Sequence, residues 1–257
     1  MTATDTVTPG TRRALSSLSI VLPCFNEAPN VLAAVTEARQ AAERFAHQHE
    51  IVVVDDGSSD DTLAIAEALA AKDPRVRVVA HDGNRGYGAA VRSGIAASQG
   101  DWVLLTDGDL QFDLSELSRF LDLTAGHELV AGYRLGRADP RWRLLAAGAW
   151  NGLMRHSFGI GVRDVDCAFK LVRGPSLRAL ALTCDGAMVS TELLVRGRMA
   201  GWRFAEVGVQ HRPRLAGEPT GGDIRVILRA FRERQALLRR LRAERRSASA
   251  AQRTAVA

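Results

Sequence analysis

The sequence predicts an α/β fold in which a mostly parallel sheet carries helices on both faces. Short apolar runs alternate with helical patterns, and polar residues do not interrupt the runs, which is typical of strands buried on both sides. Acidic clusters directly follow two of these runs, at the strand ends where ligands bind in such sheets. The composition agrees, because 257 residues with 46% hydrophobic and 25% charged residues suffice for one large domain with a buried core.

The first half of the chain supplies four strand and helix pairs. Strands are expected over 18–23, 50–54, 76–80 and 102–105. Helices are expected over 29–46, 62–71, from the glycine-rich turn 81–88 to Ser98, and from Asp113 to Leu123. The polar residues 55–61 supply N-caps for the second helix, and Asp113 and Glu116 have the spacing of a capping box.

The second half alternates less regularly. The expected elements are a strand ending at Tyr133, a helix over 141–158, a strand near 165–172, a helix over 191–199 and a strand over 204–209. Neither an internal repeat nor a linker occurs before Pro219. Residues 18–222 are therefore expected to form a single domain.

The flanking segments differ from this domain in composition. Residues 1–17 are rich in threonine and lack the apolar stretch of a secretory signal, so we expect a disordered leader, and we expect a disordered tail over 247–257. Between Asp223 and Arg246 nine arginines face three acidic residues, a net charge of +6, whereas the whole chain carries +5. The excess positive charge of the chain therefore lies in this one segment, and no nucleic acid partner is expected.

Segment 223–246 has the pattern of a basic amphipathic helix. Its apolar stripe consists of Ile224, Ile227, Leu228, Phe231, Leu238 and Leu241. Three interpretations stay open for it. The helix packs on the domain, it dimerises, or it lies on an anionic membrane face.

The cysteines and the apolar runs indicate the cellular compartment in which the protein is expected. Cys24, Cys167 and Cys184 are odd in number and lack paired spacing, which argues against a disulfide scaffold or a zinc site and fits a reducing cytosol. No apolar run approaches the ~20 residues that a membrane-spanning helix needs. We expect a soluble cytoplasmic protein, with peripheral contact on the inner face of the membrane as the role that the basic helix leaves open.

The residues with the clearest chemistry follow the fourth strand. Asp107, Asp109 and Gln111 place three oxygen ligands at its end, and Mg²⁺ and Mn²⁺ prefer such ligands. Taken alone, the same spacing also fits a solvated turn before the next helix. Asp55 and Asp56 end another strand, so two carboxylate sets are expected at one crevice, where like charges need a cation or a donor-rich ligand.

Four motifs carry a resemblance to a known family. They are Pro-Cys-Phe-Asn-Glu at 23–27, Val-Asp-Asp-Gly-Ser-Ser-Asp-Asp-Thr at 54–62, Asn-Arg-Gly-Tyr-Gly-Ala-Ala at 84–90 and Asp-Gly-Asp-Leu-Gln at 107–111. In this order they resemble the motifs of family 2 glycosyltransferases, and most of all the dolichyl/polyprenyl-phosphate sugar synthase branch (dolichol-phosphate mannosyltransferase-like). The resemblance covers about Leu18 to Gly222. It implies a GT-A fold, the nucleotide-diphospho-sugar transferase fold with a Rossmann-like sheet.

The resemblance also implies roles for individual residues. Those that match the nucleotide-binding motifs are Pro23, Phe25, Glu27 and Asp56, with Asp56 as the acid that contacts the base. Those that match the metal and diphosphate site are Asp107, Asp109 and Gln111, with Mg²⁺ or Mn²⁺ as the cofactor. The pair Gly86 and Gly88 either cradles a phosphate or only lets a helix pack closely.

On the acceptor side, the arginines that match phosphate-binding positions are Arg134, Arg143 and Arg214. Further acceptor-side candidates are Asp164, Lys170 and Glu192. The sequence departs from the family where Pro219 and Thr220 replace the usual Ser and Lys, so one phosphate ligand of the family pattern is missing there.

The implied reaction is metal-dependent transfer of a sugar, mannose or glucose first, from a nucleotide-sugar to a polyprenyl or dolichyl phosphate, with inversion. The runner-up is a soluble family 2 enzyme acting on a hydroxyl acceptor of a small molecule or polysaccharide. That reaction requires a carboxylate base, for which Asp164, Asp166 and Glu192 are available. A non-catalytic binding module and a glycoside hydrolase are two other readings; the intact Asp107–Gln111 motif argues against the first, and the second needs no nucleotide site or metal.

Overall fold

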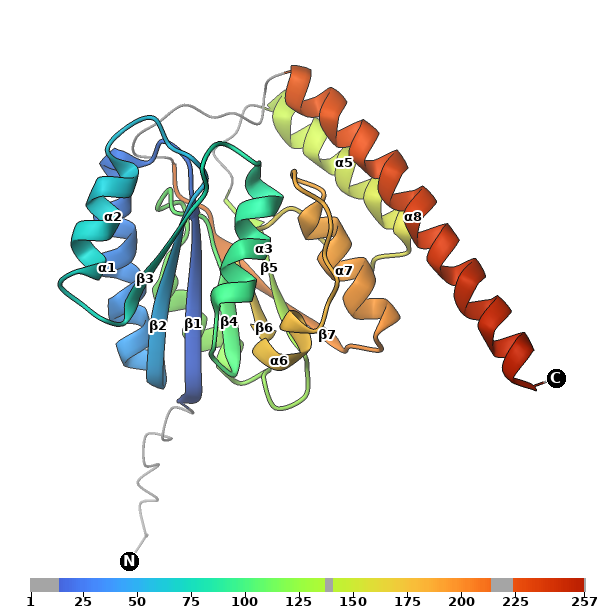
Figure 1. Ribbon diagram of the computed structural model, residues 1–257, viewed down its shortest axis with the longest axis horizontal. Helices are drawn as coiled ribbons and strands as arrows, with labels where there is room; N and C mark the ends of the chain where they lie inside the picture. Colours follow the sequence, from blue (N-terminus) through green and yellow to red (C-terminus); the bar gives the residue numbers. More distant parts are fainter. Residues whose placement is uncertain (1–13, 137–140, 214–223, 257) are drawn as a thin grey trace, which may run out of the picture.

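Seven strands form one sheet at the centre of the computed structural model, which describes residues 14–136, 141–213 and 224–256 (Figure 1). The strand order is β3-β2-β1-β4-β6-β5-β7. The strands are β1 (Leu15–Cys24), β2 (Ala46–Asp55), β3 (Val76–Ala80), β4 (Trp102–Leu105), β5 (Leu129–Leu135), β6 (Lys170–Arg173) and β7 (Phe204–Gln210). Strands β1 to β4 are parallel, β5 is parallel to β7, and β6 is antiparallel to both of its neighbours. The predicted mostly parallel α/β sheet is confirmed.

Helices cover both faces of this sheet. They are α1 (Ala28–Phe45), α2 (Thr62–Ala70), α3 (Tyr87–Ala97), the 3₁₀ turn η1 (Leu114–Leu117), α4 (Ser118–Leu121), α5 (Arg141–Phe158), α6 (Gly174–Arg178), α7 (Val189–Met199) and α8 (Ile224–Val256). Figure 1 shows α5 and α8 side by side along one flank of the molecule.

Alternation along β1 divides the apolar side chains between two cores. Ile20 and Leu22 belong to the core that α1 and α4 cover, whereas Val21 belongs to the core under α3, α5 and α7. Helix α3 lies directly on the sheet, because a Cβ on its Gly94 would be 2.3 Å from Val21. Each β1 side chain named here is fully buried, so the strand serves both cores, as its uninterrupted apolar sequence predicted.

The expected strand over 165–172 is shorter than predicted. Strand β6 begins at Lys170, and the ammonium group of this lysine donates to the backbone carbonyls of Val165 (3.1 Å) and Cys167. Carbonyls that accept from a buried ammonium hold the chain in a turn around it. The residues before Lys170 therefore do not extend the strand.

Other elements also differ from the expectation. Strand β1 begins at Leu15, inside the expected disordered leader 1–17, and β2 begins at Ala46 where a strand was expected from residue 50. Asp113 caps the next turn by accepting from the N–H of Ser115 (2.9 Å). Glu116 accepts from the N–H of Gln210 (2.9 Å), and not from the N–H of Asp113 as a capping box requires. The segment is consequently a 3₁₀ turn followed by a single α turn. Helix α8 continues to Val256, through the residues expected as a disordered tail; alanine, glutamine and arginine there favour helix.

Candidate active site

The carboxyl ends of the central strands bring the two acidic clusters together, as the sequence predicted. Strand β1 pairs with β2 so that Cys24 lies beside Asp55, and β4 lies on the other side of β1. Cys24 is 2% exposed. Burial raises the pKa of its thiol, and so do the charges of Glu27, Asp55, Asp107 and Asp109. Four carboxylates from three segments of the chain thus act on one buried thiol.

Asp107 and Asp109 lie in one tight turn after β4. Leu110 has φ of 62° there, in a region that residues other than glycine rarely adopt. The Tyr87 hydroxyl donates to Oδ1 of Asp107 (3.0 Å), and Oδ1 of Asp109 accepts from the N–H of Gln111 (3.2 Å). Burial raises the pKa of Asp107 to about 6 and the charge of Asp109 adds to this, against the hydrogen bond from Tyr87. Two like charges are therefore confined at this turn.

Gln111 connects this turn to the end of β7. Its side-chain Nε2 donates to the carbonyl of Arg212 (3.1 Å), and the N–H of Arg212 donates to the carbonyl of Gln111 (2.8 Å). Since an amide nitrogen is not a ligand for hard cations, the side-chain carbonyl oxygen is the atom of Gln111 that suits a metal.

The turn after β1 depends on Asn26, which sequence reasoning missed. Asn26 has φ of 55°, and its side-chain oxygen accepts from the N–H of Ser59 (2.8 Å). The N–H of Glu27 donates to the hydroxyl of Thr62 (2.8 Å). These contacts join the first two sequence motifs, and the tolerance of asparagine for this backbone region was the available signal.

The predicted nucleotide residues of the first motif lie around this turn in different environments. Pro23 pairs in register with Val54 in the sheet. Phe25 is 42% exposed, whereas Glu27 is buried and its Oε2 accepts from the side chain of Asn30 (2.6 Å). Phe25 therefore presents an apolar ring to solvent beside the buried acid, in a position where a planar ligand could stack.

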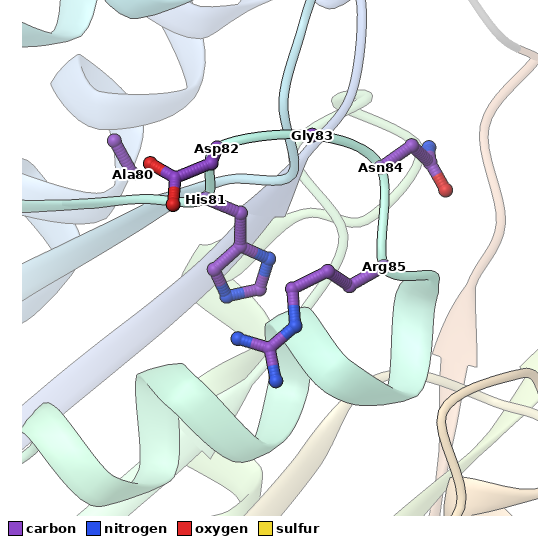
Figure 2. Close-up of a pocket in the computed structure, with 6 residues that line it drawn as sticks. All are labelled: Ala80, His81, Asp82, Gly83, Asn84 and Arg85. Atoms are coloured by element: carbon purple, nitrogen blue, oxygen red, sulfur yellow. The ribbon is translucent and has the colours of Figure 1, made fainter.

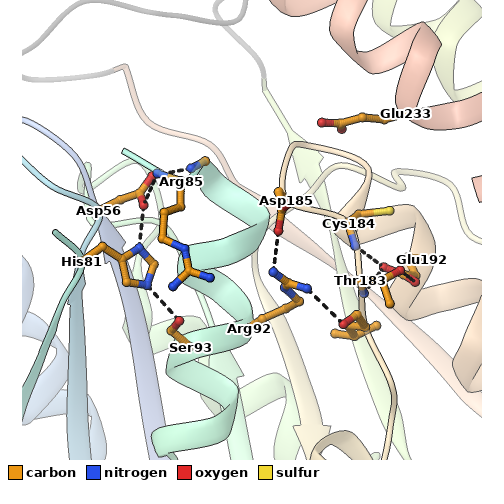
Figure 3. Close-up of polar contacts among 12 residues, drawn as sticks. Asp56, His81, Arg85, Arg92, Ser93, Thr183, Cys184, Asp185, Glu192 and Glu233 are labelled. Atoms are coloured by element: carbon orange, nitrogen blue, oxygen red, sulfur yellow. Dashed lines mark hydrogen bonds and ion pairs between the residues drawn. The ribbon is translucent and has the colours of Figure 1, made fainter. Parts of the chain in front are cut away.

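The carboxylate of Asp56 forms hydrogen bonds with other groups of the protein. Its Oδ1 bonds His81 Nδ1 (2.7 Å) and accepts from the N–H of Arg85 (2.9 Å), and its Oδ2 accepts from the N–H of Gly86 (2.8 Å) (Figure 3). The second ring nitrogen of His81 bonds the hydroxyl of Ser93 on α3 (2.8 Å). The predicted base-contacting acid therefore organises the loop between β3 and α3.

That loop borders an open cavity of about 590 Å³, lined by residues 80–85 (Figure 2). Figure 2 shows the side chains of His81 and Arg85 on the side toward α3. The neighbouring Asp55 is 1% exposed, and its Oδ2 accepts from the N–H of Ser58 (3.1 Å). Its Oδ1 is buried without a hydrogen-bond partner among the described residues, so a donor from a ligand would relieve it.

On the acceptor side, Arg134 and Asp164 pair with each other. Nε and Nη2 of the arginine donate to the two carboxylate oxygens at 2.7 and 2.8 Å. Burial favours the uncharged form of each group, but their mutual bonds and charges outweigh it, so the pKa of Asp164 is lowered and that of Arg134 is raised. This bidentate pair leaves Nη1 of Arg134 outside it.

The side chains of Lys170 and Glu192 are buried and form hydrogen bonds within the protein. Burial lowers the pKa of Lys170, against the charges of Cys167 and Asp164. Glu192 is 0% exposed and accepts from the N–H and hydroxyl of Thr183, from the N–H of Cys184 and from Arg196, all at 2.7 or 2.8 Å. Glu192 thus holds the segment before α7 in place.

The structure does not describe the side chains of two of the predicted arginines. Arg143 lies in the first turn of α5, but its side chain is not among those described. Arg214, together with Pro219 and Thr220, falls outside the described residues. Their roles stay predictions.

A family model described as "Glycosyl transferase family 2" matches residues 19–178, more than half of the chain. The chain belongs to glycosyl transferase family 2. This confirms the resemblance drawn from the four motifs, all of which lie inside the matched range.

Curated relatives of this glycosyltransferase carry related names. Glycosyltransferase AglD of Haloferax volcanii is 33% identical over 77% of this chain and 33% of its own length. Undecaprenyl-phosphate 4-deoxy-4-formamido-L-arabinose transferases of Edwardsiella ictaluri and Pseudomonas syringae are 31% and 32% identical over 84% and 82% of this chain. The chain spans between one third and two thirds of the length of these relatives.

Solved structures agree on the fold. Glucosyl-3-phosphoglycerate synthase from Mycobacterium tuberculosis, in complex with UDP, superposes with a TM-score of 0.61 at 23% identity, over 80% of this chain and 74% of that one. A complex of the same protein with Mn²⁺ and UDP-glucose gives a TM-score of 0.60 at 22% identity, over 89% and 77%. The predicted GT-A fold is confirmed.

The acidic turn of this family 2 chain fits a divalent cation. No group of three or more His, Cys, Asp or Glu side chains within the described ranges forms a metal site by itself. Asp107 and Asp109 nevertheless supply hard oxygen ligands at one turn, where burial and, after it, the charge of Asp109 raise the pKa of Asp107. A two-carboxylate site suits Mg²⁺ or Mn²⁺ that takes its other ligands from water and phosphate oxygens.

No helix in the part of the chain that the structure describes combines the length and the apolar character needed to span a bilayer.

Proposed function

We propose that this protein transfers a sugar, with mannose and glucose as the first candidates, from a nucleoside diphosphate to a polyprenyl or dolichyl phosphate. The observation that carries the proposal is the convergence of Asp55, Asp107 and Asp109 at the carboxyl ends of β2 and β4, the two strands that flank β1. The names of the undecaprenyl-phosphate relatives support a lipid phosphate as the acceptor.

Asp107 and Asp109, with the side-chain oxygen of Gln111, are the residues that would hold Mg²⁺ or Mn²⁺. A bound divalent ion supplies positive charge against the negative charge that develops on the leaving diphosphate. Tyr87 orients Asp107 through its hydroxyl. The loop residues 23–27 and Asp56 are proposed to hold the nucleoside, with Phe25 exposed beside it.

The transfer is a single displacement at the anomeric carbon. An acceptor phosphate oxygen forms the new bond, the bond to the diphosphate oxygen breaks, and its electron pair departs with the nucleoside diphosphate, so the anomeric centre inverts. A phosphate monoester is already anionic near neutral pH, since its second pKa is ~6, and needs no general base. Arg134, Arg143 and Arg214 are proposed to aim it, with Nη1 of Arg134 as the donor outside the Asp164 pair.

A lipid acceptor places the enzyme at a membrane, and α8 supports peripheral contact on the cytoplasmic side. Its exposed arginines include Arg232, Arg239, Arg242 and Arg246. Their spacing of seven, three and four residues puts them on one face of the helix, opposite the buried Leu237 and Leu241. Arginines near anionic lipids contribute ~1 kcal/mol each.

One observation favours a hydroxyl acceptor as the second candidate. Burial raises the pKa of Asp166, against the charges of Lys170 and Arg134, whereas the pKa of Asp164 is lowered. A carboxylate with a raised pKa is the better general base near neutral pH. Asp166 is therefore the proposed base if the acceptor is an alcohol.

Transfer assays with labelled sugar nucleotides distinguish these acceptors. The protein is incubated with Mn²⁺ or Mg²⁺, labelled UDP- or GDP-sugars, and either polyprenyl phosphate or water-soluble alcohols, and is then extracted with organic solvent. We expect label in the organic phase. Label that stays with a soluble acceptor would establish the second candidate, and nucleotide binding without transfer to either would leave only a binding module.

Asp109→Asn tests the metal site in the same assay. We expect it to lower turnover by at least about a hundredfold, since charge stabilisation at a leaving group is worth several kcal/mol. Asp122→Asn is the matched control, because Asp122 is an exposed acid at the end of α4, and it should retain wild-type turnover. Undiminished activity of Asp109→Asn would refute the proposed metal role.

A further inference from the structure

We propose that His81 is a positioning residue of the nucleotide site, which orients the carboxylate of Asp56 and, through it, the backbone of Arg85 and Gly86. The inference rests on the proposed function, because it concerns the nucleotide half of the donor. His81 lies outside all four sequence motifs; its assignment comes from the contacts of its two ring nitrogens.

His81 links the end of the sheet to helix α3 (Figure 3). Nδ1 bonds Oδ1 of Asp56 at 2.7 Å, and Nε2 bonds the hydroxyl of Ser93 at 2.8 Å. Both the His81 and the Asp56 side chains are 4% exposed, and the N–H of His81 donates to the carbonyl of Asp55 (2.9 Å). The imidazole is thus fixed through both ring nitrogens, the backbone of His81 is fixed by Asp55, and the ring holds Asp56 in one orientation.

The carboxylate that His81 holds has capacity left for a ligand. Oδ1 of Asp56 already has two contacts, from His81 and from the N–H of Arg85, while among the described residues Oδ2 accepts only from the N–H of Gly86. A carboxylate oxygen accepts about two hydrogen bonds. Oδ2 can therefore accept a further donor, such as the N–H of a nucleobase, provided that the carboxylate cannot rotate.

The chemistry of the pair decides which nitrogen carries the proton. An ionised Asp56 only accepts hydrogen bonds, so Nδ1 of His81 donates to it. In the neutral ring Nε2 then accepts from the Ser93 hydroxyl. Loss of the Nδ1 donor would leave Asp56 with backbone contacts alone and would loosen the turn that borders the cavity over 80–85.

Two substitutions separate the Nδ1 contact from the rest of the ring. In His81→Asn the amide nitrogen stands near the position of Nδ1 and can still donate to Asp56, whereas in His81→Gln the amide reaches toward Ser93 instead. We measure the affinity of the whole protein for UDP and GDP by calorimetry, and kcat and KM for the sugar nucleotide. His81→Gln should weaken binding of the preferred nucleotide about tenfold, as expected for loss of a charge-assisted hydrogen bond.

The same loss should raise KM by a similar factor and change kcat less than about threefold, because the missing contact acts on nucleotide binding. His81→Asn should restore affinity to within about threefold of wild type. His47→Gln is the control, since His47 is exposed near the start of β2, far from the site. It should bind as the wild type does.

The outcomes separate this inference from the proposed function. If the wild type binds neither UDP nor GDP, the proposed function itself fails. If the wild type binds and His81→Gln binds equally well, or if only thermal stability falls, then His81 is a structural residue and the inference is refuted. Equal losses in His81→Asn and His81→Gln would also refute it, because they would not depend on the Nδ1 contact.

Discussion

At the scale of single residues, the acidic turn after β4 lowers the stability of the fold near neutral pH. Burial and Asp109 raise the pKa of Asp107 to about 6, above the ordinary aspartate value of ~3.9. A carboxyl whose pKa is higher in the folded state stabilises the fold below the unfolded-state pKa, and this contribution is lost as pH rises through the folded-state pKa. Near pH 7 the ionised Asp107 therefore weakens the metal-free protein.

Asp107→Asn should consequently raise the thermal stability of the metal-free protein at pH 7, by on the order of 1–3 kcal/mol. The gain should shrink at pH 4.5, where the folded protein holds Asp107 protonated and the amide resembles it. Circular dichroism melts in EDTA at both pH values measure this. Asp122→Asn, at an exposed position, should change neither melt; an equal gain for Asp107→Asn at both pH values would contradict the raised pKa.

Some residue contacts at the site could be predicted from the sequence, and others could not. The convergence of Asp55, Asp107 and Asp109 was predictable, because strand ends of a parallel sheet meet at one edge. The bonds of Tyr87 to Asp107 and of His81 to Asp56 were not, since 20 and 25 residues separate the members of each pair. No periodicity relates side chains across a loop, a helix and a strand, so these contacts required the structure.

At the scale of elements, the start of α3 is closed by the chain itself. The carbonyl of Asp185 accepts from the N–H groups of Gly88 (2.8 Å) and Ala89 (3.2 Å), which occupies donors that could otherwise hold a phosphate. A Cβ on Gly88 would lie 2.4 Å from the carbonyl oxygen of Cys184, and one on Gly86 would lie 2.5 Å from that of Asp185. The two glycines therefore permit close packing, the second of the two roles left open by the sequence.

Gly88→Ala should destabilise the protein by roughly 1–3 kcal/mol, because the new methyl group meets a backbone oxygen that must move. Gly148→Ala is the opposite case, since among the described residues no atom outside the local backbone of α5 lies within 4 Å of the position of its Cβ. That change should stabilise by about 0.5–1 kcal/mol, as alanine for glycine does inside a helix. Urea unfolding of both variants measures the contrast; a stable Gly88→Ala would show that the 184–186 segment can yield.

Element boundaries were predictable where the local pattern alone sets them. Strands β3 and β4 and helix α5 have their predicted limits. Strand β6 and the turn η1 do not, because Lys170 draws nearby carbonyls to its ammonium group and Glu116 bonds the end of β7. Both departures arise from side chains that bond distant or buried backbone, which hydrophobic spacing does not encode.

At the scale of the whole molecule, α8 belongs to the catalytic fold. Of the three roles that the sequence left open for this helix, packing on the domain is the one observed: Leu237 and Leu241 lie in the core beneath α3 and α7. Arg196 of α7 bonds both carboxylate oxygens of Glu244 (3.1 Å each) as well as Glu192. Because Glu192 holds the 183–184 segment, polar contacts run from α8 to the loop that closes α3.

This packing predicts how trypsin attacks the protein. Helix α8 carries many arginines, yet cleavage needs a locally unfolded chain, so docking should protect it. Leu237 is 1% exposed, and Leu237→Ala should cost about 2–4 kcal/mol of stability through the lost contacts and the cavity. If docking alone is weakened, α8 should be cut at least about tenfold faster while the sheet stays resistant, as 1.4 kcal/mol already corresponds to a tenfold change.

Leu145→Ala is the matched control for this prediction, because Leu145 is 76% exposed on the neighbouring helix α5 and its truncation should leave cleavage near the wild-type rate. Mass spectrometry of the early fragments identifies the sites. Rapid cleavage of α8 in the wild type, at a rate that Leu237→Ala does not change, would show that the helix is undocked in solution and that its basic segment is available for another surface. Slow cleavage in the wild type and fast cleavage in Leu237→Ala would instead establish that the arginine face is presented by a helix whose opposite side is part of the core.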